Sequence, residues 1–170
     1  MVYDNLAQQS THFEDVWREE MWGIWGTDQR GTGKEPFEIT AMGLGCFSML
    51  KKSWPGFNPN FQQFGGEEWY IHEKVRQRGG KCICLPEFKW VHRFGRPAGA
   101  SYPLTLWHKV RNYIIGHREL GLPLDRVKEH FVQPNRLSLE QWDHLLSSDP
   151  PPLNPKQVPP SSCGGCAIPE

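Results

Sequence analysis

The 170-residue sequence lacks a net charge, because 19 lysines and arginines balance 19 aspartates and glutamates. Proteins that bind nucleic acid through its phosphates usually show a basic excess, so this balance argues against a nucleic-acid partner. The sequence also lacks any run of about 20 apolar residues, the length that a membrane-spanning helix needs. The first residues show no basic-then-apolar leader. We therefore expect a cytoplasmic protein without a membrane span.

The sequence also lacks the even number of cysteines that a complete set of disulfides would require. The five cysteines, an odd number, are Cys46, Cys82, Cys84, Cys163 and Cys166. Without an export signal this count predicts reduced thiols instead of a complete disulfide framework. Cys163 and Cys166 have the spacing of a metal or redox pair, but a single such pair is weak evidence for a metal site.

Aliphatic runs are short, and the hydrophobic content lies mostly in large rings. Eight tryptophans and nine phenylalanines occur in a chain whose mean hydropathy is -0.60. Such rings either fill a core or line a groove. At this length the default is a single core.

The first half of the chain mixes helical and strand signals. Segment 11–21 opens like a capping box and continues with apolar residues at helical spacing, which predicts a helix. Segment 22–33 is rich in glycine and threonine and predicts a mobile loop. Apolar alternation at 37–40 and the apolar run at 44–50 predict two strands, the second of them buried.

The second half shows clear helix starts and stops. A segment that runs from acidic to basic residues lies between Gly65-Gly66 and Gly79-Gly80. A longer segment with apolar residues at helical spacing ends at Gly121, and Ser138 is placed to cap a final short helix. These signals predict helices at 67–78, from Leu106 to Gly121, at 125–131 and after Ser138, with a strand at 81–85. Prolines crowd the chain from residue 149 onward.

Four short motifs follow one another in the middle of the chain. They are Ala41-Met42-Gly43-Leu44-Gly45-Cys46-Phe47, Gly56-Phe57-Asn58-Pro59-Asn60-Phe61, Phe64-Gly65-Gly66-Glu67-Glu68 and Arg76-Gln77-Arg78-Gly79-Gly80. Over about a third of the chain this order resembles the acceptor-side half of GT-A glycosyltransferases. The nearest parallels are the β-1,4-galactosyltransferase and polypeptide N-acetylgalactosaminyltransferase groups. There a Trp-Gly-Gly-Glu-(Asp or Asn) motif begins a helix at the acceptor site; here Phe64 replaces the Trp and Glu68 the Asp or Asn.

The resemblance implies an α/β protein: a partial GT-A (Rossmann-like) fold with a helical C-terminal extension. We expect residues 1–100 to form the acceptor and catalytic half, 101–148 the helical extension, and 149–170 a disordered Pro-rich tail. The implied activity is transfer of a sugar from a nucleotide-sugar donor to a hydroxyl of a sugar or glycan acceptor. Inversion is expected from a carboxylate base, although retention stays open because one of the two groups is retaining.

The two glutamates are the candidate catalytic residues. A carboxylate within hydrogen-bond reach of the acceptor hydroxyl can take its proton. Neighbouring helical residues point about 100° apart, so only one can face the reaction. The resemblance favours Glu68 as base and Glu67 as acceptor binder, with Gly65 and Gly66 as a substrate-facing pocket floor. The alternative is an ordinary turn whose glutamates favour the helix dipole.

The remaining candidates bind metal, diphosphate or sugar. The resemblance gives His92 the role of a Mn²⁺ or Mg²⁺ ligand, and guanidinium groups of Arg93 and Arg96 suit a diphosphate. A strand-end histidine with two solvated arginines is the plainer alternative. Trp54 and Trp69 are the first candidates for sugar platforms, because an indole face packs on a pyranose. Trp22 and Trp25 are further candidates, although most of these rings are expected in the core.

No Asp-x-Asp motif, which such enzymes use to hold the metal against the diphosphate, occurs in the chain. A donor-binding half is therefore expected to be missing from the N-terminal side; supply by another chain or loss of catalysis are the alternatives. We expect weak metal affinity and little activity of the chain alone. A second hypothesis is a non-catalytic carbohydrate-binding or scaffold module derived from such an enzyme. A third is a small Cys/His metal-binding interaction protein.

Overall fold

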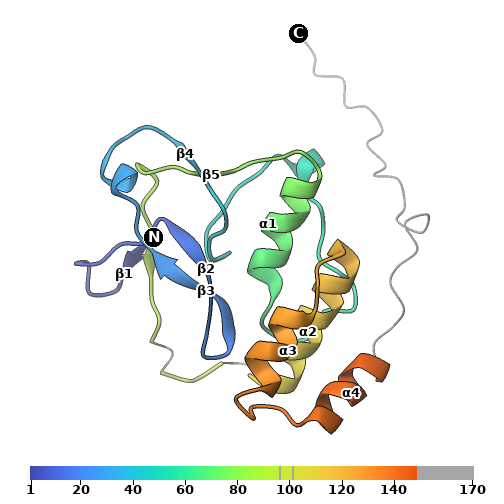
Figure 1. Ribbon diagram of the computed structural model, residues 1–170. Helices are drawn as coiled ribbons and strands as arrows, with labels where there is room; N and C mark the ends of the chain where they lie inside the picture. The colour runs from blue at the N-terminus through green and yellow to red at the C-terminus, as the bar shows by residue number, and fades with distance from the viewer. Residues whose placement is uncertain (96, 101, 149–170) are drawn as a thin grey trace.

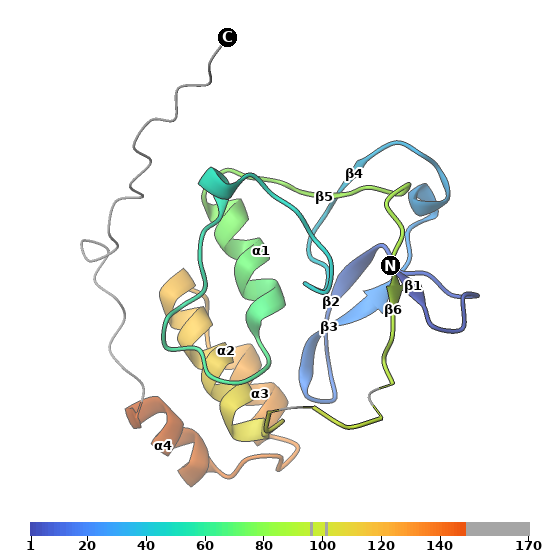
Figure 2. The same cartoon turned by 180° about the vertical axis from the view of Figure 1, so that it is seen from behind.

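The computed structural model describes residues 1–95, 97–100 and 102–148. Two views show the strands gathered on one side of the molecule and the helices on the other (Figures 1 and 2). In the described residues the elements are β1 (Val2–Tyr3), β2 (His12–Arg18), β3 (Met21–Gly26), η1 (Gln29–Thr32), β4 (Phe37–Ile39), η2 (Lys51–Ser53), α1 (Glu67–Gln77), β5 (Cys82–Cys84), β6 (Val91–His92), α2 (Leu106–Leu120), α3 (Asp125–Val132) and α4 (Leu139–Ser148). The protein therefore has the mixed α/β content expected from its sequence.

The strands of the described residues form three two-stranded sheets. β2 and β3 are an antiparallel hairpin with Phe13 opposite Trp25. β4 and β5 are antiparallel, with Phe37 opposite Cys84. β1 and β6 pair in parallel, with Val2 opposite Val91. The N-terminus is thereby joined to the segment that carries His92.

The helix predicted at 11–21 and the loop predicted at 22–33 are wrong, because the hairpin β2–β3 occupies nearly all of the first segment, and β3 together with η1 occupies most of the second. The four-residue step from Phe13 to Trp17 fits a strand face as well as a helix face, and the register is irregular between Glu14 and Trp17. Val16, which fitted only the helix, is 42% exposed. Thr11 caps no helix; its hydroxyl accepts from the Asp28 amide at 2.9 Å.

The strand predicted at 44–50 is also wrong. The segment pairs with no strand of the described residues, and Phe47 and Leu50 are 50% and 66% exposed. Gly43 and Gly45 lie against the rings of Trp25 and Trp90, where a Cβ would come within 2.6 and 2.5 Å of ring carbons. Close ring contacts therefore explain the small residues of this motif. The strands predicted at 37–40 and 81–85 are confirmed as β4 and β5.

All four predicted helices are confirmed. α2 is capped at its start by Thr105, whose hydroxyl accepts from the His108 amide, and at its end by Gly121 with φ 65°. The hydroxyl of Ser138 accepts from the Gln141 amide at 3.1 Å and caps α4. These caps are local interactions, which is why the sequence signals placed the helix ends well.

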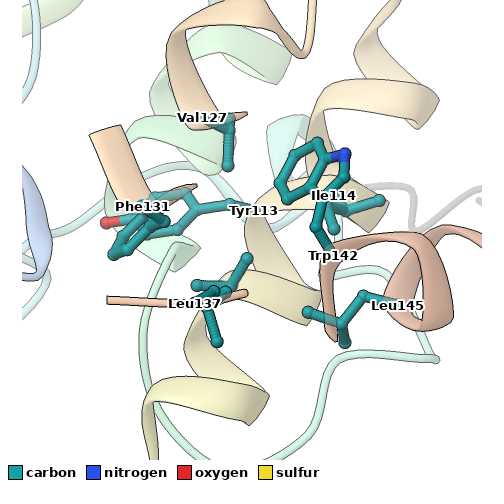
Figure 3. Packing of buried hydrophobic residues seen from close by; sticks show 8 residues of the cluster. Tyr113, Ile114, Val127, Phe131, Leu137, Trp142 and Leu145 are labelled. Carbon is teal, nitrogen blue, oxygen red and sulfur yellow. The ribbon is translucent and has the colours of Figure 1, made fainter. Parts of the chain in front are cut away.

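The main core lies among α2, α3 and α4 (Figure 3). Its buried members are Val110, Tyr113, Ile114, Val127, Phe131, Leu137, Trp142 and Leu145. Trp17 and Trp22 of the hairpin pack against this cluster. The helical extension is thus joined to residues 1–100 through the hairpin rings.

Three predictions concern residues that lie outside the described part of the chain. These are residues 149–170, with Cys163 and Cys166, and Arg96. Cys46, Cys82 and Cys84 are free thiols. Across the described ranges, each helix is too short or too polar to cross a bilayer.

Candidate functional site

The start of α1 is built by two glycines in left-handed conformations. Gly65 has φ 112° and Gly66 φ 88°, values that L side chains rarely adopt. A Cβ on Gly65 would lie 2.5 Å from Cγ of Lys109, and the Gly65 carbonyl accepts from the amide of Asn112 at 3.0 Å. Close packing of α2 therefore requires a glycine at position 65, whether or not a substrate lies nearby. The expected substrate-facing floor is, at Gly65, a contact between the loop before α1 and helix α2.

Glu67 and Glu68 differ in how their carboxylates are used. The Glu67 carboxylate accepts from the amide of Gly65 at 2.8 Å and so caps its own helix. No other residue of the described chain donates a hydrogen bond to the Glu68 carboxylate, although the residue is only partly exposed. Glu68 is therefore the freer of the two acids, and its catalytic role stays a prediction.

Burial acts on both acids. It raises the pKa of Glu67, and burial together with the neighbouring Glu67 charge raises the pKa of Glu68 to about 7. Lys109 opposes this shift in both groups; its ammonium also pairs with Glu20 at 2.8 Å. A carboxylate that changes protonation near neutral pH is suited to act as a general base.

Tyr113 of α2 completes the surroundings of the two acids. The phenol is buried, and burial followed by the charges of Glu68 and Glu67 raises its pKa. Its oxygen accepts from the Trp22 amide at 2.9 Å, so it ties the hairpin to the helix that faces Glu68. Sequence analysis did not identify Tyr113 or Lys109, because their proximity to α1 arises from the packing of α1 against α2.

Three indoles form a continuous stack beside this site. The ring centroids are 5.5 Å apart for Trp17 and Trp22 and 4.6 Å apart for Trp22 and Trp69, with 7° between the planes in each pair. Gly23 is needed here, since a Cβ would lie 2.5 Å from the indole nitrogen of Trp69. Trp69 is only 5% exposed. The sugar-platform role expected for Trp69 is therefore wrong, because a covered ring offers no face to a pyranose.

Trp54 lies in a cluster of exposed rings. Its centroid is 5.9 Å from that of Phe47 and 5.2 Å from that of Phe57. The exposed fractions are 36% for Trp54, 50% for Phe47 and 45% for Phe57. An exposed indole flanked by two rings can stack on the apolar face of a sugar. Sequence analysis named Trp54 but not its two partners.

His92 lies at the end of β6 in an aromatic surround. Its ring centroid is 4.0 Å from that of Phe94, 5.5 Å from that of Trp90 and 6.1 Å from that of Trp25. Its Nδ1 is buried and has no hydrogen-bond partner in the described chain. Arg93 beside it is exposed.

A divalent ion would need more ligands than His92 alone. Among residues 1–95, 97–100 and 102–148 no group of three His, Cys, Asp or Glu side chains can hold a metal. The buried Nδ1 offers one donor, whereas Mn²⁺ and Mg²⁺ prefer several oxygen ligands. The described residues therefore do not form a metal site by themselves.

A cavity of about 240 Å³ lies among α1, the β4–β5 pair and segment 42–49. It is lined mainly by apolar side chains and by His72, and neither glutamate nor His92 lines it. The His72 ring bridges two segments, since Nδ1 donates to the Glu68 carbonyl at 2.6 Å and Nε2 accepts from the Met42 amide at 3.2 Å. His72 thus fastens the 41–47 motif to the helix that carries Glu68.

The structure brings some of the predicted residues together and separates others. Gly65, Gly66, Glu67 and Glu68 share one surround with Lys109 and Tyr113, whereas Trp54 and His92 each contact a different set of rings. Ring contacts connect His92 through Trp25 to Phe13, which shares a cluster with Trp69.

No protein-family model, curated protein or solved structure matches this chain.

Proposed function

We propose that the chain is the acceptor-side part of a GT-A-type glycosyltransferase, with Glu68 as the general base. One observation carries the proposal: the Glu68 carboxylate, on the first turn of α1 behind Gly65-Gly66, accepts no hydrogen bond from another described residue, and its pKa is raised to about 7. Structural carboxylates are usually paired or ionised well below neutral pH. The order of motifs around Glu68 resembles that of GT-A glycosyltransferases and so points to sugar transfer as the reaction class.

In the proposed reaction an acceptor hydroxyl oxygen attacks the anomeric carbon of a nucleotide sugar. The new glycosidic C–O bond forms as the bond to the diphosphate breaks, the electron pair leaves with the diphosphate, and the hydroxyl proton passes to Glu68. Glu67, already bound to the Gly65 amide, keeps the helix start in place. A diphosphate partner is proposed for Arg93. No step is assigned to a metal ion, because the described residues contain no group of three His, Cys, Asp or Glu side chains that could hold one.

Substitution of Glu68 by Gln tests the proposal. Transfer is measured with a panel of labelled nucleotide sugars and glycan acceptors, with Mn²⁺ added and with any donor-binding polypeptide encoded beside the chain. E68Q is expected to lower kcat by about 10²- to 10⁴-fold, because the base is lost. The KM for the acceptor should change less than about threefold. Glu73→Gln on the same helix is the matched control, since Glu73 pairs with Arg76 at 2.8 Å. Full turnover of E68Q, or equal loss in E73Q, would contradict the proposal.

The exposed rings favour a second function, a carbohydrate-binding module without turnover. Phe47, Trp54 and Phe57 can hold a glycan whether or not Glu68 acts on it. In that case no nucleotide sugar is consumed, whereas glycan binding on an array is lost in Trp54→Ala and kept in Trp54→Phe. Turnover that depends on Glu68 would reject this function, and binding unaffected by Trp54→Ala would reject the ring cluster as its site.

A further inference from the structure

A groove that sequence analysis did not identify lies between strand β2 and helix α3. It has a volume of about 500 Å³ and is lined by Trp17, Arg126, Glu129, His130, Gln133 and Pro134. Four of these residues recur at positions i, i+3, i+4 and i+7 and so share one face along α3 and its C-terminal end. Val127 and Phe131, on the neighbouring face, are fully buried in the helical core. The polar face is therefore held in a fixed position.

Two of the lining side chains are held by contacts with the hairpin, and the third, Trp17, is a hairpin residue held by rings of α2 and α3. The guanidinium of Arg126 donates to both carboxylate oxygens of Asp15, at 2.9 and 3.3 Å. Nε2 of His130 donates to the Glu19 carbonyl at 2.6 Å. The Trp17 ring packs against those of Tyr113 and Phe131 with centroid distances of 4.9 and 5.8 Å. The floor and one wall of the groove are therefore preorganised.

Two lining side chains remain available to a ligand. Glu129 and Gln133 are exposed, and neither side chain forms a hydrogen bond or ion pair with another residue of the described chain. When Nε2 of His130 carries the proton, its Nδ1 is an acceptor. A carboxylate, an amide and an imidazole acceptor beside an indole are suited to neighbouring hydroxyls on a ring with one apolar face. Asp15 compensates the charge of Arg126, and Glu129 disfavours anions.

We propose that this groove is a saccharide subsite that holds an uncharged pyranose of the acceptor glycan. The inference rests on the proposed function, because it extends the acceptor site away from Glu68. The stack from Trp17 through Trp22 to Trp69 links the groove to α1 by two ring spacings of 5.5 and 4.6 Å.

An NMR titration of the full chain tests the subsite, with lactose and cellobiose as probes. The indole N–H signal of Trp17 and the amides of residues 126–133 are expected to shift. The double substitution Glu129→Ala with Gln133→Ala should weaken binding by about threefold to tenfold, the value of one hydrogen bond. Lys128→Ala is the matched control, because Lys128 is exposed on α3 and does not line the groove. All three side chains are exposed, so their removal leaves the core intact.

The outcomes separate this inference from the proposed function. Shifts that miss Trp17 and α3, or unchanged affinity in the double variant, would overturn the subsite, even if E68Q still abolishes turnover. Full turnover of E68Q would instead overturn the proposed function, even if both sugars bind along α3. Equal weakening by Lys128→Ala would also count against the subsite, because it would mark a general effect of altering α3.

Discussion

The helical part and the strand part of the molecule bury their large apolar side chains to different extents. In the helical part five side chains are 0% exposed: Val110, Ile114, Val127, Phe131 and Leu145. On the strand side, Phe47, Leu85, Phe88 and Phe94 are 50%, 50%, 61% and 41% exposed. Burial of one such side chain stabilises a fold by about 1.5–3 kcal/mol. The comparison indicates that the helices supply most of the stability, whereas the strand side offers surfaces.

Glu68 lies at the boundary between these parts. It belongs to the first turn of α1, and the charges of Lys109 in α2 and of Glu67 act on it. Burial near the core disfavours its ionised form, while the residue remains partly exposed at the surface. A boundary position therefore provides what a neutral-pH base requires. Four predictions test this division of the molecule.

The largest effect is expected in the helical core. Phe131→Ala should destabilise the protein by about 3–5 kcal/mol, because it removes a fully buried ring and leaves a cavity. Phe88→Ala is the matched substitution on the strand side and should change stability by less than about 0.5 kcal/mol. Urea unfolding followed by circular dichroism measures both. Similar losses in the two variants would contradict the comparison.

The second effect concerns Glu68 itself. Its folded-state pKa, about 7, lies above the ordinary value of 4.5, so between these pH values the folded protein holds a proton that the unfolded chain has lost. Stability therefore falls as the pH rises through this window. Glu68→Gln should raise stability by about 1–3 kcal/mol at pH 8 and leave it nearly unchanged at pH 4.

Thermal unfolding at the two pH values checks this prediction. Glu140→Gln serves as the control, since Glu140 is exposed on α4 and far along the chain from the site. A variant that is more stable yet inactive would be the signature of a carboxylate kept for function. A Glu68→Gln protein that is less stable at pH 8 would show that the charged form is favoured in the folded state.

The sequence predicted the helical part well because its signals are local. The αL glycine at 121 and the cap at Ser138 act within one or two turns of chain, so they can be recognised without knowing the fold. The prediction of the strand part failed because its signals are not local. Whether Phe13 and Trp17 share a strand or a helix depends on Trp25 and Trp22 opposite them, and residue spacing alone cannot show those partners.

The candidate site was predicted in part. The motif correctly placed the glycine pair and Glu68 at the start of a helix, whereas the catalytic role of Glu68 stays a prediction. Trp69 was taken for a sugar platform, because nothing in the local sequence shows that Trp22 covers its ring. Lys109, Tyr113 and the α3 groove were missed, since each depends on contacts between distant segments.

A smaller effect is expected at the start of α2. The hydroxyl of Thr105 accepts from the His108 amide and caps the helix. Thr105→Ala should cost about 1 kcal/mol, whereas Thr105→Ser should restore most of this loss because it keeps the hydroxyl. Urea unfolding measures both variants. Equal losses would show that the methyl group of Thr105, not its hydroxyl, stabilises the helix start.

The smallest effect on stability is expected from Lys109→Met. The ion pair of Lys109 with the half-exposed Glu20 contributes less than about 1 kcal/mol, and Met keeps an apolar stem against Gly65. Lys109 lowers the pKa of both Glu67 and Glu68, so its loss should raise both pKa values. Carbon-13 NMR of the glutamate carboxyl carbons during a pH titration measures this change. If the Glu68 midpoint stays in place or falls, Lys109 does not act on the carboxylate, and burial together with the Glu67 charge sets its proton affinity.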